Sequence, residues 1–170
     1  MKKLSNLSNP PKILAIAKKI EEREITGNVL VLDDIQDPGN LGTIIRSAVS
    51  FGIDTIVASK NTVDVYNSKV IRATEGMLFK INYLKSDLLS FINGNKDNYT
   101  FITTDVSSGN DINDIKIDKP YALIMGNEGS GVRKEISDEI DNKVHIKMNP
   151  VCESLNVSIA TSILLYELYK

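Results

Sequence analysis

The sequence has few of the residues on which metal-binding and disulfide-stabilised proteins depend. Its 170 residues include one cysteine, Cys152, one histidine, His145, and no tryptophan. A single cysteine excludes a disulfide within the chain, so a reducing, cytoplasmic location is expected. His145 has no histidine or cysteine partner at metal-site spacing, and no metal is expected. Cys152 has no histidine nearby in sequence to activate it and is interpreted as a bystander.

Long apolar runs are also missing. The longest runs, such as residues 121–125, have the length of a strand and are far too short to span a membrane. Polar residues follow Lys2 and Lys3 where a secretory signal would need an apolar core. The composition, 42% hydrophobic and 25% charged, is that of an ordinary globular protein, and the length suits one domain. No membrane partner is expected.

An excess of positive charge is absent as well. The formal net charge is −2, whereas proteins that contact phosphates are usually basic. Basic residues predominate in residues 1–24 and acidic ones in residues 133–141. The plain interpretation of both segments is a solvated surface. The charge therefore counts mildly against nucleic-acid binding.

What the chain does contain is an alternation of short apolar runs and helical segments. Residues 1–26 are interpreted as an N-terminal arm, polar up to residue 11 and helical from Ile13 to Glu24, and residues 27–170 as the main domain. Strands are expected at residues 29–32, 55–58, 80–84, 99–104, 121–125 and 143–148. Helices are expected at residues 40–50, 68–74, 86–93, 132–140 and 155–169. This alternation predicts an α/β fold with a parallel sheet flanked by helices.

Three polar loops stand where ligands bind in such sheets, beyond the carboxyl ends of strands. The second of these loops is GNEGSG, at residues 126–131. Its glycines allow a ligand to approach the backbone, but it lacks the signatures of phosphate and dinucleotide loops and could be a simple turn. A turn does not need Glu128 between two glycines, whereas a polar ligand or an arginine partner would.

The first and third loops both begin helices. In PGNLGTIIRSA, residues 38–48, Asn40 is expected to cap the helix, and Arg46 among apolar neighbours needs an anionic partner, either phosphate or Glu128. In ESLNVS, residues 153–158, Ser154 is the expected cap, and Asn156 adds polar groups beyond what capping requires. The apolar stripe expected to face the core consists of Leu155, Ile159 and Ile163.

Taken in order, these loops resemble the three signature motifs of the SpoU–TrmH family of RNA ribose 2′-O-methyltransferases, in the SPOUT superfamily. The matching stretches are LDDIQDPGNLGTIIRSAVSFGID, ALIMGNEGSGV and IKMNPVCESLNVSIATSILLYEL, and VIRATEGMLF resembles the family's connecting segment. The resemblance extends from about Gly27 to the C-terminus. Three motifs in order and at family spacing make it specific.

The resemblance implies S-adenosylmethionine as methyl donor, RNA as substrate with ribosomal RNA favoured over transfer RNA, and a homodimer with the active site at its interface. It also implies a deep trefoil knot at the C-terminal end of the α/β domain. The positions that match cofactor binding are Thr104, Gly126, Ile146, Ser154 and Leu155. The positions that match catalysis and substrate placement are Asn40, Arg46, Glu128, Ser154 and Asn156.

Two departures from the family pattern are visible. The third motif usually opens Ile-Pro-Met, but here Lys147 takes the place of the proline. Many relatives also carry an N-terminal RNA-recognition domain, and LSNLSNPPKILAIAKK resembles the linker that follows it. The recognition module is therefore expected to be naturally absent, removed, or supplied by another protein.

The expected mechanism assigns Arg46 to the RNA. A guanidinium is a very poor base, with a pKa above about 12, so Arg46 is interpreted as a phosphate clamp that polarises the ribose hydroxyl, held in place by Glu128. Asn40 and Asn156 would orient the site through amide hydrogen bonds. Two alternatives remain open: an RNA-binding member of the fold with weak or lost activity, and a small-molecule or nucleotide-binding α/β protein with no role on RNA.

Overall fold

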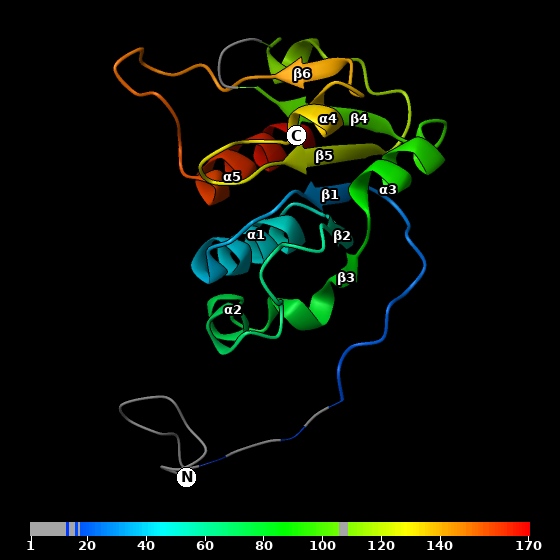
Figure 1. The fold of residues 1–170 in the computed structure, drawn as a ribbon, viewed down its shortest axis with the longest axis vertical. Coiled ribbons are helices and arrows are strands. Elements are labelled where there is room, and N and C mark those ends of the chain that lie inside the picture. The colour runs from blue at the N-terminus through cyan, green and yellow to red at the C-terminus, as the bar shows by residue number, and fades with distance from the viewer. Residues whose placement is uncertain (1–12, 14–15, 17, 106–108) are drawn as a thin grey trace.

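Six parallel strands form a single sheet in the order β3-β2-β1-β5-β4-β6 (Figure 1). The computed structural model describes residues 13, 16, 18–105 and 109–170. The strands are β1 (Val29–Leu32), β2 (Thr55–Ala58), β3 (Asn82–Lys85), β4 (Thr100–Thr104), β5 (Tyr121–Met125) and β6 (Asn142–Val144). The prediction of a parallel α/β sheet is confirmed.

Helices cover both faces of this sheet. They are α1 (Pro38–Ser50), α2 (Ser68–Ala73), α3 (Leu88–Asn95), α4 (Lys134–Ser137) and α5 (Val157–Tyr169), with short 3₁₀ turns η1 (Met77–Lys80) and η2 (Ile112–Asp114). In β1, Leu30 and Leu32 belong to the core beneath α1, α2 and α5, and Val29 and Val31 to the core beneath α3 and α4. Alternate residues of one strand thus face opposite layers, which is why the central strands are apolar throughout.

The strand order changes direction at β1. From β1 the chain adds β2 and β3 on one side, and β5, β4 and β6 lie on the other. The pairing of β1 with β5 continues past the strands, where the Asp33 N–H donates to the Met125 carbonyl at 2.8 Å. Such a switch point leaves a crevice at the carboxyl ends of the strands, where ligands bind in open α/β sheets.

Both predicted helix caps were misplaced. Asp37, not Asn40, caps α1, accepting from the Asn40 N–H at 2.8 Å, and Asn156, not Ser154, caps α5 through the N–H groups of Ser158 and Ile159. In each segment two capping residues stand close together, and the helix begins at the one whose oxygen reaches the free N–H groups. Asn40 and Ser154 are thereby left for other contacts.

The predicted core stripe of α5 was also wrong. The buried residues of α5 include Val157, Thr161, Leu164 and Leu165. Ile159 and Ile163 are 52% and 37% exposed, and Tyr166 beside them is 49% exposed. The helix is apolar on nearly every side, so periodicity alone could not identify the inward face. Its outer face remains an uncovered apolar surface.

The expected helix from Ile13 to Glu24 is contradicted at residues 18–24, which carry no helix. The Arg23 N–H donates to Asn82 Oδ1 at 2.9 Å, Asn82 Nδ2 donates back to the Arg23 carbonyl at 2.9 Å, and the Ile20 N–H donates to the Tyr66 hydroxyl. A short helix that buries little apolar surface is marginally stable in water. Here the side chains of Asn82 and Tyr66 form the hydrogen bonds of these backbone groups in place of helical ones. The polar arm at residues 1–11 lies outside the described residues.

The sixth strand is shorter than predicted. It ends at Val144, and residues 145–148, expected to continue it, leave the sheet. The expected helix at residues 132–140 is reduced to α4. None of the helices in the described ranges is long and apolar enough to cross a membrane.

Candidate functional site

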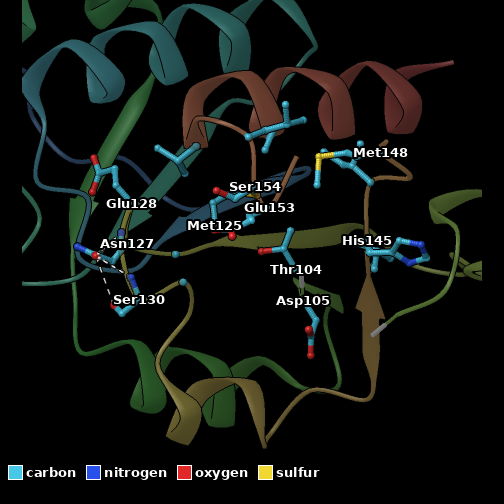
Figure 2. A pocket seen from close by; sticks show the side chains of 18 residues that line it. Thr104, Asp105, Met125, Asn127, Glu128, Ser130, His145, Met148, Glu153 and Ser154 are labelled. Carbon is cyan, nitrogen blue, oxygen red and sulfur yellow. Dashed lines mark hydrogen bonds between the residues drawn. The ribbon is translucent and has the colours of Figure 1, made fainter. Parts of the chain in front are cut away.

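A cavity of about 370 Å³ opens at the carboxyl ends of β4, β5 and β6, next to the start of α5. Its walls are the residues that follow β4, the loop at residues 126–131 and the segment from His145 to Leu155. Figure 2 shows Asn127, Glu128 and Ser130 at one end and His145 and Met148 at the other. The five residues expected at a cofactor site all line this cavity: Thr104, Gly126, Ile146, Ser154 and Leu155.

The GNEGSG loop is closed by its own backbone. The N–H groups of Asn127 and Gly131 each donate to the other's carbonyl, at 3.0 and 2.9 Å. Asn127 Oδ1 accepts from the Gly129 and Ser130 N–H groups, and Asn127 Nδ2 donates to the Asp34 carbonyl at 2.8 Å. Asn127 therefore organises the loop and ties it to the end of β1. Sequence reasoning overlooked it, although an asparagine directly after a strand is a turn signal.

Gly126 permits this loop by its lack of a side chain. A Cβ at this position would lie 2.1 Å from the Gly131 carbonyl carbon and 2.1 Å from the Val132 nitrogen. Both atoms belong to the backbone, so no side-chain rotation can relieve the overlap. The glycine is required here for the close approach of two chain segments, which is one of the uses of glycine.

A partly buried ion pair fixes the far end of the loop. Asp33 is fully buried at the end of β1, and its carboxylate accepts from Arg133 Nε at 2.8 Å and from the Arg133 N–H at 2.9 Å. Partial burial acts to lower the pKa of Arg133, but the hydrogen bond and charge of Asp33 outweigh it and raise that pKa. Neither residue was predicted as part of the site, because their contact joins positions 100 residues apart.

Three of the residues expected to act in catalysis form one hydrogen-bonded chain. Asn40 Nδ2 donates to Glu128 Oε1 at 3.1 Å, and Asn156 Nδ2 donates to Asn40 Oδ1 at 3.0 Å. A carboxylate only accepts, so it fixes which end of the Asn40 amide faces Asn156. Asn156 Oδ1 then remains for the first N–H groups of α5. The three loops are thus joined through side chains.

Glu128 is held as an anion. Its carboxylate also accepts from the N–H groups of Gln36 and Asp37, at 3.2 and 3.1 Å. Partial burial acts to raise the pKa of Glu128, but the hydrogen bonds from the Asn40 side chain and from these backbone groups outweigh it, so the pKa lies below its ordinary value. The first turn of α1 has no acidic residue of its own, and Glu128 adds to the Asp37 cap the negative charge that a helix N-terminus favours.

We expect Glu128→Gln to destabilise the fold by about 1 kcal/mol at neutral pH, since its bonds are charge-assisted but partly exposed. The pKa of Glu128 is lowered in the folded state, so its contribution is fully present above its unfolded pKa and is lost as the pH falls through the folded value. Thermal unfolding of both proteins between pH 7 and pH 3 should show the difference in Tm shrinking in acid. A difference that grows in acid would contradict this account.

Arg46 does not contact Glu128, and the prediction that Glu128 holds it was wrong. Arg46 Nη1 donates instead to Glu75 Oε1 at 3.2 Å. Glu128 bonds the first turn of α1, whereas six residues of helix separate Arg46 from Asn40 by about 9 Å along the axis and by a large rotation. Arg46 is also not among the residues that line the cavity of its own chain.

The remaining residues singled out in the sequence have small local roles. His145 lines the cavity, and its Nδ1 donates to the Gly109 carbonyl at 2.7 Å. Cys152 is exposed, and its Sγ lies 3.2 Å from the Ser154 carbonyl. Ser154 itself faces the cavity without capping α5.

Comparison with known proteins identifies this arrangement. Residues 27–166 match the model of the SpoU rRNA Methylase family. The chain is 34% identical over 167 residues to the 23S rRNA (guanosine(2553)-2'-O)-methyltransferase RlmP of Bacillus subtilis, a match that covers 97% of this chain and 67% of that protein. The next relatives are covered over 62% of their length, so the chain spans about two thirds of the proteins it matches.

Solved structures agree with this match. The AdoMet-bound rRNA methyltransferase from Sinorhizobium meliloti superposes with a TM-score of 0.79 at 32% identity, covering 86% of this chain and 57% of that one. The SpoU methyltransferase AviRb from Streptomyces viridochromogenes, in complex with the cofactor AdoMet, superposes with a TM-score of 0.78 at 25% identity, covering 91% and 62%. With its fold, its three loops and the family match over residues 27–166, the chain belongs to the SpoU rRNA methylase family.

Proposed function

We propose that this chain transfers a methyl group from S-adenosylmethionine to a ribose 2′-hydroxyl of structured RNA, with ribosomal RNA favoured over transfer RNA, in the cytoplasm. The observation that carries the proposal is the placement of all five expected cofactor residues around one cavity, next to the Glu128–Asn40–Asn156 chain. The names of the relatives, among them a 23S rRNA 2'-O-methyltransferase, support the same reaction.

The lining of the cavity fits S-adenosylmethionine. Val144, Ile146 and Leu155 offer apolar surface suited to an adenine ring, and Asp105 and Glu153 offer negative charge suited to a sulfonium and an ammonium group. The volume of about 370 Å³ lies in the range of small-ligand sites, about 300–1,000 Å³. Gly126 brings backbone close to this space, where its polar groups would bind the nucleoside.

The reaction requires alignment of oxygen, carbon and sulfur in line, and exclusion of water. S-adenosylmethionine supplies an electrophilic methyl group on a sulfonium. The loops at Gly126, Ile146 and Leu155 would hold this donor, and Glu128 would fix the amides of Asn40 and Asn156 beside it. Arg46 would bind a phosphate of the RNA and donate a hydrogen bond to the ribose hydroxyl oxygen, which stabilises the charge on that oxygen as its proton passes to solvent. The new O–C bond would form as the C–S bond breaks, with the electron pair left on sulfur.

A homodimer would account for the absence of Arg46 from the lining of its own cavity. The outer face of α5, made of Ile159, Ile163 and Tyr166, is apolar and exposed. The helix α5 itself lies beside α1, since Ser47 and Ser162 share a 2.7 Å hydrogen bond. We propose that a second copy packs on this face and that Arg46 serves the cavity of the partner.

Ile163→Asp is expected to produce a monomer, because it places a charge in the apolar face that the partner would cover. Sedimentation should show half the mass of the wild-type protein, and methyl transfer should be lost while S-adenosylmethionine still binds. Ile71→Asp, at an exposed isoleucine of α2, is the matched control and should stay dimeric. A wild-type protein that is monomeric at the concentrations of the assay would exclude the shared site.

We further propose that the C-terminal part is tied in the trefoil knot implied by the family. In support, the chain runs out to β6 at the edge of the sheet and then returns. On its return, α5 packs on α1 and on η2, and η2 belongs to the connection between β4 and β5. Stretching the chain from both termini in an optical trap would test this. When a knotted chain is pulled out, the tightened knot retains some residues, so the stretched length is shorter than that of 170 fully extended residues. A stretched length that matches all 170 residues would reject the knot.

Mapping of ribose 2′-O-methylation in total RNA, with and without the gene, tests the activity and names the nucleotide. One methylated position should disappear with the gene and return with the wild-type chain but not with Arg46→Lys. Calorimetry with S-adenosylmethionine distinguishes the alternative of an RNA-binding protein without activity, because such a protein would not bind S-adenosylmethionine. An unchanged methylation map together with no binding would exclude the proposed reaction.

A further inference from the structure

Glu75, in the turn between α2 and η1, is the partner that the structure gives to Arg46. Arg46 Nη1 and Glu75 Oε1 are 3.2 Å apart. The side chains are 47% and 68% exposed, so the pair adds little to stability in water. A contribution to folding therefore does not account for a glutamate at this position.

The backbone of Glu75 is in an unfavourable conformation. Its φ is 47°, in the left-handed region, and Gly76 follows with a φ of 86°. Glycine and asparagine adopt this region readily, whereas a glutamate pays for the clash of its Cβ with the backbone. Local turn chemistry would thus favour another residue, and strained residues of this kind gather at functional sites.

The surrounding contacts hold the turn firmly against α1. A Cβ on Gly42 of α1 would lie 2.3 Å from Ala73 Cβ, so the end of α2 is in close contact with α1. Thr74 is fully buried, and its hydroxyl donates to the Ile71 carbonyl at 2.8 Å. With Ala73 and Thr74 fixed in this way, the carboxylate of Glu75 is presented to Arg46 from a rigid support.

The pair uses only part of the guanidinium. Among the hydrogen bonds of the described residues, Glu75 engages Nη1 of Arg46 through one oxygen. A guanidinium carries five N–H donors in a fixed plane. Fixing one edge of that plane orients the others, and they remain available for an anion that presents two oxygens side by side, such as a phosphate.

We propose that Glu75 is a positioning residue for Arg46: it holds the guanidinium in the orientation in which its free edge meets the RNA phosphate and the ribose hydroxyl. The role rests on the proposed function, since it acts only through Arg46. It accounts together for the strained backbone, the rigid support and the one-sided ion pair. It also gives the half-exposed Arg46 a fixed anionic partner in place of Glu128.

Glu75→Asn tests this role, because asparagine accepts the left-handed conformation and its side chain is too short to hold Arg46. The wild-type chain is first tested on three unmodified RNAs, 16S rRNA, 23S rRNA and a tRNA pool, with radiolabelled S-adenosylmethionine as methyl donor. The RNA that it methylates is then used as substrate for the variant. We expect kcat to fall by about 10- to 100-fold, as for a misplaced catalytic group, with KM for RNA changed by less than about threefold. The Tm should be kept or raised.

Two comparisons make the result specific. Glu139→Gln removes another exposed ion pair, the one with Lys96, and should leave kcat unchanged. In an Arg46→Lys background, Glu75→Asn should lower kcat no further, because Glu75 acts only by orienting the guanidinium that this background already lacks. A wild-type chain that methylates none of the RNAs would reject the proposed function and this role with it. An active wild type with normal kcat in Glu75→Asn, a multiplicative loss in the double variant, or a Tm that falls together with kcat would reject the role of Glu75 alone.

Discussion

Arg46→Lys is expected to lower kcat for RNA methylation by about 100- to 1000-fold while leaving the affinity for S-adenosylmethionine unchanged. The magnitude is that of removing one directed donor from a site where charge develops. Lysine keeps the positive charge, but it replaces a planar fork with a single ammonium, which cannot bind a phosphate through two parallel hydrogen bonds while a third donor meets Glu75 or the ribose hydroxyl.

The position of Arg46 explains why kcat should fall while the affinity for S-adenosylmethionine is kept. Arg46 is not part of the lining of its own cavity, and its side chain donates instead to Glu75, in the turn after α2. Single-turnover kinetics should therefore show the loss, and calorimetry with S-adenosylmethionine should match the wild type. Arg72→Lys, at an exposed arginine in the last turn of α2, is the control and should retain near-normal turnover. Near-normal turnover by Arg46→Lys would remove Arg46 from the mechanism.

Much of the fold could be predicted because the signals are local. Val29–Leu32 and Tyr121–Met125 are short runs buried on both faces, and both form central strands of the sheet. The signal failed where the burial pattern is set by distant neighbours. In α5 apolar residues lie on nearly every side, so the choice of Leu164 and Leu165 over Ile159 and Ile163 as the inward face depends on where α1 lies.

In the site, too, residues that stand in short sequence motifs could be predicted, whereas contacts between residues far apart in the sequence could not. Gly126, Ile146 and Leu155 could be predicted at a cofactor site because each stands in a short motif that resembles one of the family's, and all three line one cavity. The partner of Arg46 could not: Glu128 was predicted, whereas the packing of α2 on α1 brings Glu75 to the guanidinium. The contact of Asp33 with Arg133, which are 100 positions apart, was equally beyond a pattern read along the chain.

Gly126→Ala is expected to weaken S-adenosylmethionine binding by at least about 100-fold. Because the added methyl would lie 2.1 Å from backbone atoms of Gly131 and Val132, the loop must open at the cavity wall, and overpacking of this kind costs about 1–3 kcal/mol or more. Calorimetry and thermal unfolding should record both losses. Gly94→Ala is the matched control: in α3, a Cβ there meets nothing within 4 Å, and it should stabilise the fold by about 0.5–1 kcal/mol. Normal affinity in Gly126→Ala would show that this loop does not hold the methyl donor.

Gly126→Ala and Arg46→Lys together decide whether the site is shared between two copies. Each variant alone should be inactive, one for lack of a cavity and the other for lack of the guanidinium. In a mixed dimer, the intact cavity of the Arg46→Lys copy would face the intact Arg46 of the Gly126→Ala copy. Random mixing makes half of the dimers mixed, each with one of its two sites complete, so refolding the variants together should restore about a quarter of wild-type activity. If Arg46 served its own cavity, no mixed dimer would contain a complete site, and the mixture would stay as inactive as its parts.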